Sequence, residues 1–454
     1  MSHIAGFDFG TSNCAVGMIE QGQPQLLPLA ADSRYLSSTV YAPQPEMIAA
    51  WVEQQLAQSG NVDAYRQARA TSLAASRFAL KEARLDGYGD QLAFGAEALK
   101  LYLEDPADCF YVRSPKSFLG ANGLPQRQQI QFEDIATAMM SHIATQVRQS
   151  GRGEMRKVVI GRPVNFQGFD AETSNQQAIA ILSNAAKFAG FEQVEFLYEP
   201  MAAGLSYQQQ LTEEQLVLVV DIGGGTSDVS MLQMGPDYLN TREHSSLVHG
   251  FAGERIGGND FDIALNYRGL MPALGLGKEL AQGRSMPIKP FLNAASINVL
   301  PAQTEFYSLD TLVQLREYVR QPGLEMLNGL ITLQRERLTY RLSADAEQAK
   351  IALSQQDSAT VDLSYLWEGL NSNVSTDTFA EASERLLNRI AALADKVIAD
   401  AGRQPDRIFI TGGSANSPLI TGFLRQRYQV PLVAGDNFGS VTSGLTLWAQ
   451  RIFA

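Results

Sequence analysis

The chain has 454 residues, of which 45% are apolar, and carries a formal net charge of -12. This length leaves room for two or three domains with cores of their own, and the acidic balance argues against broad contact with the phosphate backbone of nucleic acid. Because no run of 18 apolar residues and no leader pattern occurs, and Cys14 and Cys109 are the only cysteines, we expect a cytoplasmic protein that contacts neither nucleic acid nor membrane.

Short apolar runs separated by helical periodicity give the coarse structure. We expect strands at 4–7, 14–19, 158–160, 216–220, 229–234 and 408–410. A helix predicted over 134–147 has Ile135, Met139, Ile143 and Val147 on one face, and a second helix ends at Gly190 as its C-cap. Strands that alternate with helices indicate an α/β fold.

One pattern occurs twice. An apolar run, an aspartate and a glycine-rich turn form IAGFDFGTSNCAVGM at 4–18 and VVDIGGGTSDVS at 219–230. Each is followed later by a strand that ends in a polar turn, in KVVIGRPVNF and in DRIFITGGSAN. The repeated order predicts two similar lobes whose turns face a common cleft. Outside the duplication, 44–92 is predicted to be a helical insertion, and 270–330 carries Pro, Gly and Asn breaks followed by helix.

The repeated turns have the composition of a phosphate site. Backbone N–H groups can approach a phosphate closely where no Cβ intervenes, and the candidate donors are those of Gly10, Thr11, Ser12, Gly223, Gly224 and Gly225. Asp8 and Asp221 would repel phosphate directly, so we expect them to hold the water shell of a Mg²⁺ ion. The Thr11 and Thr226 hydroxyls could then contact terminal phosphate oxygens.

Other motifs with similar composition fit these turns less well. A single copy of this pattern is equally typical of a plain β-hairpin with Asp and Gly in turn positions, but two copies in matching order favour the phosphate site. The segment GLGKEL at 275–280 does not complete the GxxxxGK[ST] pattern, and no GxGxxG stands between a strand and a helix.

Five motifs in the same order resemble the ATPase domain of Hsp70 chaperones, within the actin and sugar-kinase superfamily. They are FDFGTSNCAVG, VVDIGGGTSDVS, YEPMAAGLSY, HGFAGERIGGNDFD and RIFITGGSANSPLI. Two further fragments, GRPVNFQG and VRSPKSFLG, are most similar to short bacterial Hsp70-like proteins of the YegD type. The resemblance implies a two-lobed actin-like α/β fold in which each lobe has an RNase H-like mixed sheet flanked by helices.

The resemblance also implies domain boundaries and a set of ligands. Lobe I is expected at 1–211 and 437–454, with its helical insertion near 44–92. Lobe II is expected at 212–436, with a helical subdomain near 260–350. The implied ligands are ATP or ADP with Mg²⁺.

The family's site residues can be carried over to matching positions. Asp8 and Asp221 are implied to organise the Mg²⁺ waters, Glu199 to align the attacking water, and Asp228 to support the site. Glu199 precedes Pro200, so an ordinary helix-start carboxylate is the alternative interpretation. The remaining implied nucleotide contacts are Gly10, Thr11, Ser12, Asn13, Gly223, Gly224, Gly225, Thr226, Gly257, Gly258, Gly412, Gly413, Ser414 and Asn416.

The family's adenosine-binding residues match this sequence only in part. Glu347, Lys350 and Ser354 resemble the residues that bind ribose and base, although without the resemblance Glu347 and Lys350 would be interpreted as a solvated surface pair. Ile351 and Asn416 stand where the family clamps adenine between two arginines, which puts the base preference in doubt.

The catalytic lysine of the family follows a glycine by four residues. Counted from Gly95, that position is Leu99, so either a shifted turn brings Lys100 into the cleft or the lysine is absent.

The final segment GDNFGSVTSGLTLWAQRIFA resembles the last turn and helix of the ATPase domain. From this we expect no substrate-binding domain in the chain, and an unidentified protein client or regulator that binds the lobes. The leading hypothesis is a slow Mg-ATPase whose lobes close around ATP. The alternatives are a non-hydrolysing nucleotide sensor or scaffold, a small-molecule kinase and an actin-like filament protein.

Overall fold

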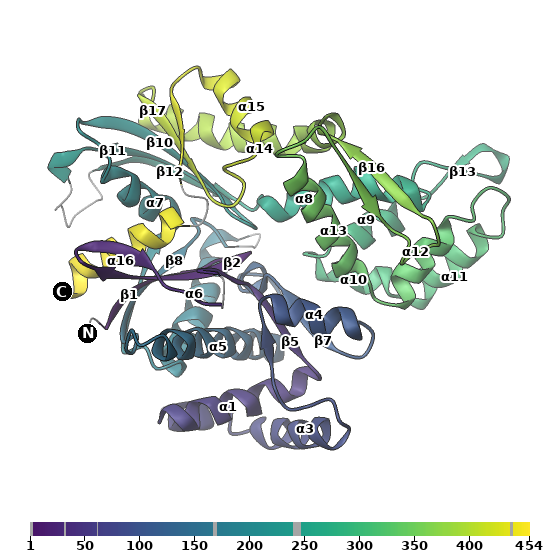
Figure 1. Ribbon diagram of the computed structural model, residues 1–454, viewed down its shortest axis with the longest axis horizontal. Helices are drawn as coiled ribbons and strands as arrows, with labels where there is room; N and C mark the ends of the chain where they lie inside the picture. Colours follow the sequence, from purple (N-terminus) through teal and green to yellow (C-terminus); the bar gives the residue numbers. More distant parts are fainter. Residues whose placement is uncertain (1–2, 31–32, 61, 167–169, 239–246, 436–438) are drawn as a thin grey trace.

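The computed structural model describes residues 3–30, 33–60, 62–166, 170–238, 247–435 and 439–454. Within them the chain forms two lobes, each with its own mixed sheet (Figure 1). The first sheet contains β1 (Ile4–Phe9), β2 (Asn13–Glu20), β3 (Gln23–Leu26), β4 (Leu36–Ser37), β8 (Lys157–Arg162) and β9 (Gln193–Tyr198). The second contains β10 (Gln215–Ile222), β11 (Ser227–Met234), β12 (Val248–Glu254), β17 (Arg407–Thr411) and β18 (Leu432–Ala434).

The two sheets share one topology. Their strand orders are β3-β2-β1-β8-β9 and β12-β11-β10-β17-β18. In both, the first two pairings are antiparallel and the last two are parallel. All six predicted strands are confirmed, and the fold is the two-lobed α/β arrangement that the repeated sequence pattern predicts.

Helices cover the sheets where the periodicity predicts buried faces. On α5 (Gln126–Gln149), the four predicted core residues are fully buried. After α6 (Ala171–Phe188), Gly190 has a φ of +97°, the left-handed conformation of a C-cap glycine. Two helices meet between the lobes, because α7 (Glu199–Gln208) packs against α16 (Gly439–Phe453), which also covers β1. The second sheet is covered by α14 (Thr376–Ala401), and α15 (Pro418–Tyr428) follows β17.

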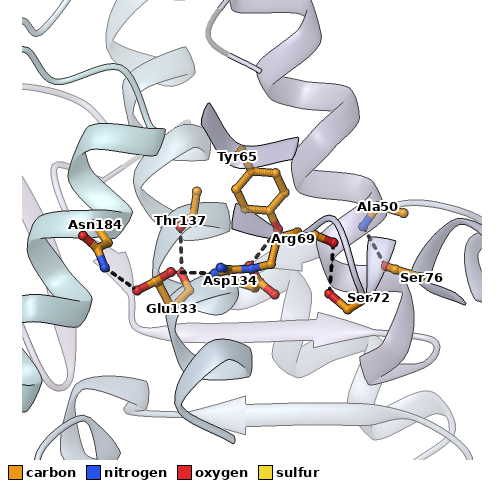
Figure 2. Close-up of polar contacts among 9 residues, drawn as sticks. All are labelled: Ala50, Tyr65, Arg69, Ser72, Ser76, Glu133, Asp134, Thr137 and Asn184. Carbon is orange, nitrogen blue, oxygen red and sulfur yellow. Dashed lines mark hydrogen bonds and ion pairs between the residues drawn. The ribbon is translucent and has the colours of Figure 1, made fainter. Parts of the chain in front are cut away.

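Lobe I carries an insertion of helices and short strands between β4 and α5. Its elements are β5 (Thr39–Ala42), η1 (Pro45–Met47), α1 (Ile48–Ser59), α2 (Val62–Ala68), α3 (Leu73–Leu85), β6 (Ala93–Phe94), α4 (Ala96–Glu104), β7 (Phe110–Arg113) and η2 (Pro115–Phe118). A buried polar cluster joins the insertion to α5 (Figure 2). In it, Arg69 contacts Glu133 at 2.7 Å and Asp134 at 2.8 Å, and the Tyr65 hydroxyl donates to Asp134 at 2.7 Å.

Lobe II carries a larger extension, which points away from the two sheets (Figure 1). Its helices are α8 (Gly258–Leu265), α9 (Lys289–Ala295), α10 (Leu300–Phe306), α11 (Leu309–Tyr318), α12 (Leu327–Arg335) and α13 (Thr339–Ala352). Two small hairpins accompany them, β13 (Glu279–Leu280) with β14 (Arg284–Ser285), and β15 (Ser358–Asp362) with β16 (Asn371–Ser375). None of the helices that the structure describes is long and apolar enough to cross a membrane.

Candidate functional site

The tips of the two repeated hairpins touch. A Cβ added to Gly224 would lie 1.9 Å from the Ser12 Oγ, and one added to Gly225 would lie 2.8 Å from the Thr11 Cγ2. Both distances are far below van der Waals contact, so only glycine lets the β10–β11 turn pack against the β1–β2 turn. The glycine run is therefore needed for the approach of two backbones from different lobes.

A pocket of about 50 Å³ lies where the hairpins meet. Both repeated aspartates line it, together with Glu199 from the start of α7. The complete lining is Asp8, Gly10, Thr11, Ser12, Asn13, Glu199, Asp221, Gly223, Gly224, Thr226, Gly412, Gly413 and Val441. The structure thus brings the acidic and glycine-rich parts of the expected site into one place.

The pocket carboxylates are removed from water. Burial, followed by repulsion from Glu199, raises the pKa of Asp8 to about 7. The same two causes, with a further contribution from Asp228, raise the pKa of Asp221 well above its ordinary value. Such a group of acids is unfavourable unless cations or donors compensate it.

Lys116 supplies a positive charge next to this pocket, against the lining residue Glu199. Its Nζ lies 2.5 Å from Glu199 Oε1 and 3.4 Å from the Gly161 carbonyl oxygen, and its side chain is 4% exposed. Burial disfavours the Lys116 charge, but Glu199 and Asp8 outweigh this cost and raise its pKa. Lys116 therefore stays protonated beside two carboxylates.

Lys116 is not among the site residues predicted from the sequence, whereas Lys100 is. Lys100 lies on α4 with its side chain 64% exposed, 3.4 Å from Glu97, and is not part of the pocket lining. The count from Gly95 led to the wrong segment because α4 and β7 intervene before the η2 turn, which carries Lys116. The available signal was the fragment VRSPKSFLG, in which a lysine follows a proline and precedes the buried Phe118.

Glu199 is held by the helix that it begins. It is the first residue of α7, Tyr198 is the N-cap, and Pro200 occupies the first turn, where a missing N–H costs nothing. The N-terminus of a helix favours an anion, and Lys116 contacts the Glu199 carboxylate directly. The position is a helix-start carboxylate and also part of the pocket.

Asp228 and two further glycines lie on the far side of the hairpin. The Val164 N–H donates to Asp228 Oδ1 at 2.8 Å, while burial, then Glu199, raises the pKa of Asp228 to about 8. A Cβ on Gly257 would lie 2.5 Å from the Gly224 and Gly225 backbone, and the Gly258 N–H donates to the Gly223 carbonyl at 2.8 Å. These contacts fix the turn from behind.

The residues expected at the adenosine end are Glu347, Lys350 and Ser354. Glu347 and Lys350 each contact another residue and do not form the surface pair that their spacing indicates. Glu347 accepts from Arg113 at 2.7 Å, and Lys350 contacts Asp262 at 2.7 Å. Ser354 Oγ donates to the Lys350 carbonyl at 3.4 Å. Ser414 Oγ lies 3.2 Å from a Cβ position on Gly258, which places β17's polar turn beside α8.

The positions of the family's adenine clamp lie on the surface. Ile351 is 49% exposed, and Asn416 is exposed in the turn after β17. Neither side chain can form the cation stacking that two arginines provide.

Arg113 reaches from lobe I to lobe II, and tyrosines surround this crossing. Tyr102 stacks on Tyr111 at 4.7 Å between ring centroids, and both rings meet Tyr340 of α13 edge to face. The Tyr102 hydroxyl also donates to the Arg337 carbonyl. These contacts join the insertion of lobe I to the helical extension of lobe II.

The pocket acids fit a hydrated magnesium ion. Asp221 is buried and Asp8 is half-buried, and they come from opposite lobes; Mg²⁺ usually takes one or two carboxylates and keeps several waters. A divalent cation would offset the repulsion that raises their pKa values. No group of three or more His, Cys, Asp or Glu side chains in the described ranges forms a direct metal cage.

Comparison with known proteins decides the family. The family model described as "Hsp70 protein" matches residues 117–268 and 315–435. The chain belongs to the Hsp70 family. Glu199, Asp221 and Glu347 of this Hsp70 protein fall inside the matched segments, whereas the hairpin with Asp8 precedes them.

Curated relatives are chaperones of the DnaK type. "Chaperone protein dnaK3" of Synechocystis sp. is 23% identical over 435 residues, which are 94% of this chain and 45% of that protein. "Chaperone protein dnaK3" of Thermosynechococcus vestitus is 23% identical over 436 residues, 94% of this chain and 52% of the relative. "Chaperone protein dnaK" of Trieres chinensis is 23% identical, with 92% and 56% covered. The chain spans about half the length of these relatives.

Proposed function

We propose that this Hsp70 protein binds Mg-ATP between its two repeated hairpins and hydrolyses it slowly to ADP and phosphate. The observation that carries the proposal is the meeting of Asp8, Asp221 and Glu199 in one small pocket, with Lys116 paired to Glu199. Acids for a hydrated metal, one buried cation and glycine amides are the parts that phosphoryl transfer needs, because its catalysis is mainly positioning and charge stabilisation.

Each residue has a role in this proposal. The Gly224 amide and the Thr226 hydroxyl donate to phosphate oxygens, while Asp8 and Asp221 would hold the waters of a bound metal ion. Bound Mg²⁺ neutralises charge on the phosphate oxygens. Glu199 orients the attacking water, and Lys116 both fixes Glu199 and faces the charge that develops on the transferred group.

ATP must separate the two hairpin tips before it can bridge them. The Gly224–Ser12 and Gly225–Thr11 contacts leave a pocket of about 50 Å³. Once phosphates occupy the space between the tips, both lobes contact the same ligand. Loss of the terminal phosphate then changes the preferred angle between lobes, because only a differential contact can shift such an equilibrium.

The wider assignment rests on the relatives. Their names are those of chaperones, and we propose a chaperone-type role in the cytoplasm for this chain, with a protein client or regulator that binds the lobes. We also place it with the short Hsp70-like proteins of the YegD type, on the fragments GRPVNFQG and VRSPKSFLG.

Calorimetry and single-turnover hydrolysis test the ATPase proposal. Wild-type protein should bind ATP in the presence of Mg²⁺ and form ADP. Asp221→Asn and Thr226→Val should abolish turnover while circular dichroism and the thermal unfolding midpoint stay close to wild type. Unchanged turnover in either folded variant contradicts the assignment.

A non-hydrolysing nucleotide sensor is the second candidate. It is favoured by the exposed positions of Ile351 and Asn416 and by the use of Glu347 to hold Arg113. The ion pair of Lys116 with Glu199, which lines the pocket, argues for hydrolysis instead. Tight ATP binding without ADP formation in single-turnover assays would identify the sensor.

A further inference from the structure

A second hollow lies within lobe I, away from the two hairpins. Its volume is about 300 Å³, at the lower end of the range for small-molecule sites, and it shares no residue with the hairpin pocket. The chain therefore has room for a small ligand outside the proposed nucleotide site. We name this hollow the lobe I pocket and define it by Gln55, Gln58, Ser141, Thr145, Arg148 and Arg156.

Polar side chains of two neighbouring helices line the lobe I pocket. On α5, Ser141, Thr145 and Arg148 follow one another at i, i+4 and i+7, so they share one face of the helix. On α1, which packs against α5, Gln55 and Gln58 are three positions apart and also line the pocket. The two helices therefore present amides, hydroxyls and a guanidinium to the same space.

Ser141 carries a buried hydroxyl that the protein does not use. The residue is 7% exposed, and its Oγ has no hydrogen-bond partner among the described residues. Thr137, one turn earlier, donates its hydroxyl to the Glu133 carbonyl at 2.7 Å, a type of bond that Ser141 does not form. A buried polar group without a partner costs free energy, so a ligand that bonds to Ser141 would recover that cost.

Neighbouring side chains also have bonding capacity left for a ligand. Within the part of the chain that the structure describes, Gln55 and Thr145 have no side-chain hydrogen bond, and Arg148 has no ion pair. An amide or a hydroxyl offers both a donor and an acceptor. A hydroxyl of a ligand also donates and accepts, so it matches such a lining better than a group that can only accept.

The formal charges of the lining cancel. Two arginines, Arg148 and Arg156, stand against two glutamates, Glu154 and Glu192. Arg156 lies 2.9 Å from Glu154 and 3.3 Å from Glu192, so one guanidinium holds both acids. The hydrogen bond from Arg156 lowers the pKa of Glu154, with a smaller contribution from Arg148, and this acid stays ionised. A lining without net charge favours a neutral polar ligand.

The lobe I pocket and the hairpin pocket lie at opposite ends of two strands. Arg156 directly precedes β8 and Glu192 directly precedes β9, whereas Glu199 directly follows β9. The two strands pair in parallel, and six residues of strand span about 20 Å. A small ligand in one pocket therefore cannot reach the other.

We propose that the lobe I pocket binds a small neutral polyhydroxylated molecule of the monosaccharide class. The sugar hydroxyls bond to Ser141, Thr145 and Gln55, and Arg148 donates to a sugar oxygen. All of these side chains belong to lobe I, so the site needs neither nucleotide nor closure of the lobes. It is independent of the proposed ATPase activity.

Saturation-transfer NMR and calorimetry test the site with glucose, galactose, mannose and ribose as probes. Without nucleotide, wild-type protein should bind at least one of these sugars saturably. The fully O-methylated form of that sugar keeps the ring but lacks hydroxyl donors, and it should bind at least tenfold more weakly. No saturable binding of any of the sugars overturns the proposal. Tighter binding of the phosphorylated sugar than of the neutral one also overturns it and assigns the pocket to an anion.

Ser141→Ala separates a ligand contact from a structural one. The variant should bind the sugar at least threefold more weakly, while its unfolding midpoint without ligand stays equal to or above that of wild type, because the lost hydroxyl has no partner in the described protein. Thr145→Val should weaken binding by a similar factor. A lower midpoint of Ser141→Ala together with unchanged sugar affinity would make the hydroxyl structural and overturn the proposal.

Thr212→Val is the matched control for Thr145→Val, because Thr212 is an exposed threonine outside the pocket. It should bind the sugar like wild type. Equal affinities of wild type, Ser141→Ala and Thr145→Val overturn the proposal. Sugar binding that is lost in Asp221→Asn but unchanged in Ser141→Ala also overturns it and places the sugar between the hairpins.

Discussion

The two lobes share one sheet topology but fasten their additions by different means. In lobe I, Arg69, Glu133 and Asp134 join the insertion to α5 through buried charges (Figure 2). In lobe II, the helical extension is packed around fully buried aromatic rings, among them Phe291 and Phe306. The two similar sheets position the site residues. The insertion of lobe I and the extension of lobe II are each stabilised by contacts of their own.

The two lobes also differ in what they contribute to the pocket between the hairpins. Each hairpin contributes one aspartate and a glycine-bearing turn to the pocket, which is the symmetric part. The contribution of Lys116 and Glu199 is asymmetric, because both come from lobe I segments that pack beside Asp8. The comparison predicts that the aspartates act as a pair and that Lys116 has no counterpart to replace it.

The largest expected effect comes from breaking the symmetric pair. Asp8→Asn and Asp221→Asn should each reduce ATP turnover to background, because either change leaves one carboxylate for the metal waters. Turnover is measured by single-turnover ADP formation, with folding checked by circular dichroism. Retained activity in only one of the two variants would show that the lobes do not contribute equally.

Substitution of the buried Lys116 tests the contribution that lobe I alone makes to the site. Lys116→Ala should lower kcat by about 10²–10³-fold, the typical loss when one preorganised donor is removed from a charged transition state. Lys100→Ala is the control, since Lys100 is exposed on α4 and should keep activity within about twofold. Equal losses in the two variants would contradict the placement of Lys116.

The free energy of unfolding tests whether buried charges hold the insertion of lobe I in place. Arg69→Met leaves Asp134 buried without its cation, and breaking such a pair destabilises by about 3–5 kcal/mol. Denaturant unfolding followed by circular dichroism measures the loss. Arg427→Met in lobe II, which removes an exposed pair with Asp395, should shift the unfolding midpoint little. Similar shifts would remove the contrast between the lobes.

The smallest effect is expected at the crossing between lobes. Arg113→Gln releases Glu347 and should change the ATP dissociation constant several-fold while kcat at saturating ATP stays within about twofold. Calorimetry and steady-state kinetics separate these two quantities. A fall in kcat as large as that of Lys116→Ala would place Arg113 at the reacting phosphate.

The sequence predicted the parts of the fold that depend on local pattern. Apolar runs locate β1, β2, β8, β10, β11 and β17, and 3.6-residue periodicity locates the buried face of α5. The short strands β5, β6 and β7 were not predicted. Strands of two to four residues in a small three-stranded sheet carry too little periodicity to be recognised.

The site was predictable where one motif repeats and was missed where it depends on tertiary contact. The hairpin aspartates follow from VVDIGGGTSDVS and its first-lobe counterpart. Lys116 and Glu199 are 83 positions apart, and Arg113 and Glu347 are 234 apart. No local pattern links such pairs, so the i, i+3 spacing of Glu347 and Lys350 suggested a mutual surface pair that the structure does not form.

The most direct test is a crystal structure of the protein with Mg²⁺ and a non-hydrolysable ATP analogue. The account predicts that the terminal phosphate lies between the β1–β2 and β10–β11 turns, with Asp8 and Asp221 bonded to metal waters and the Lys116 Nζ close to that phosphate. A nucleotide bound elsewhere, or contacting one hairpin alone, would contradict it.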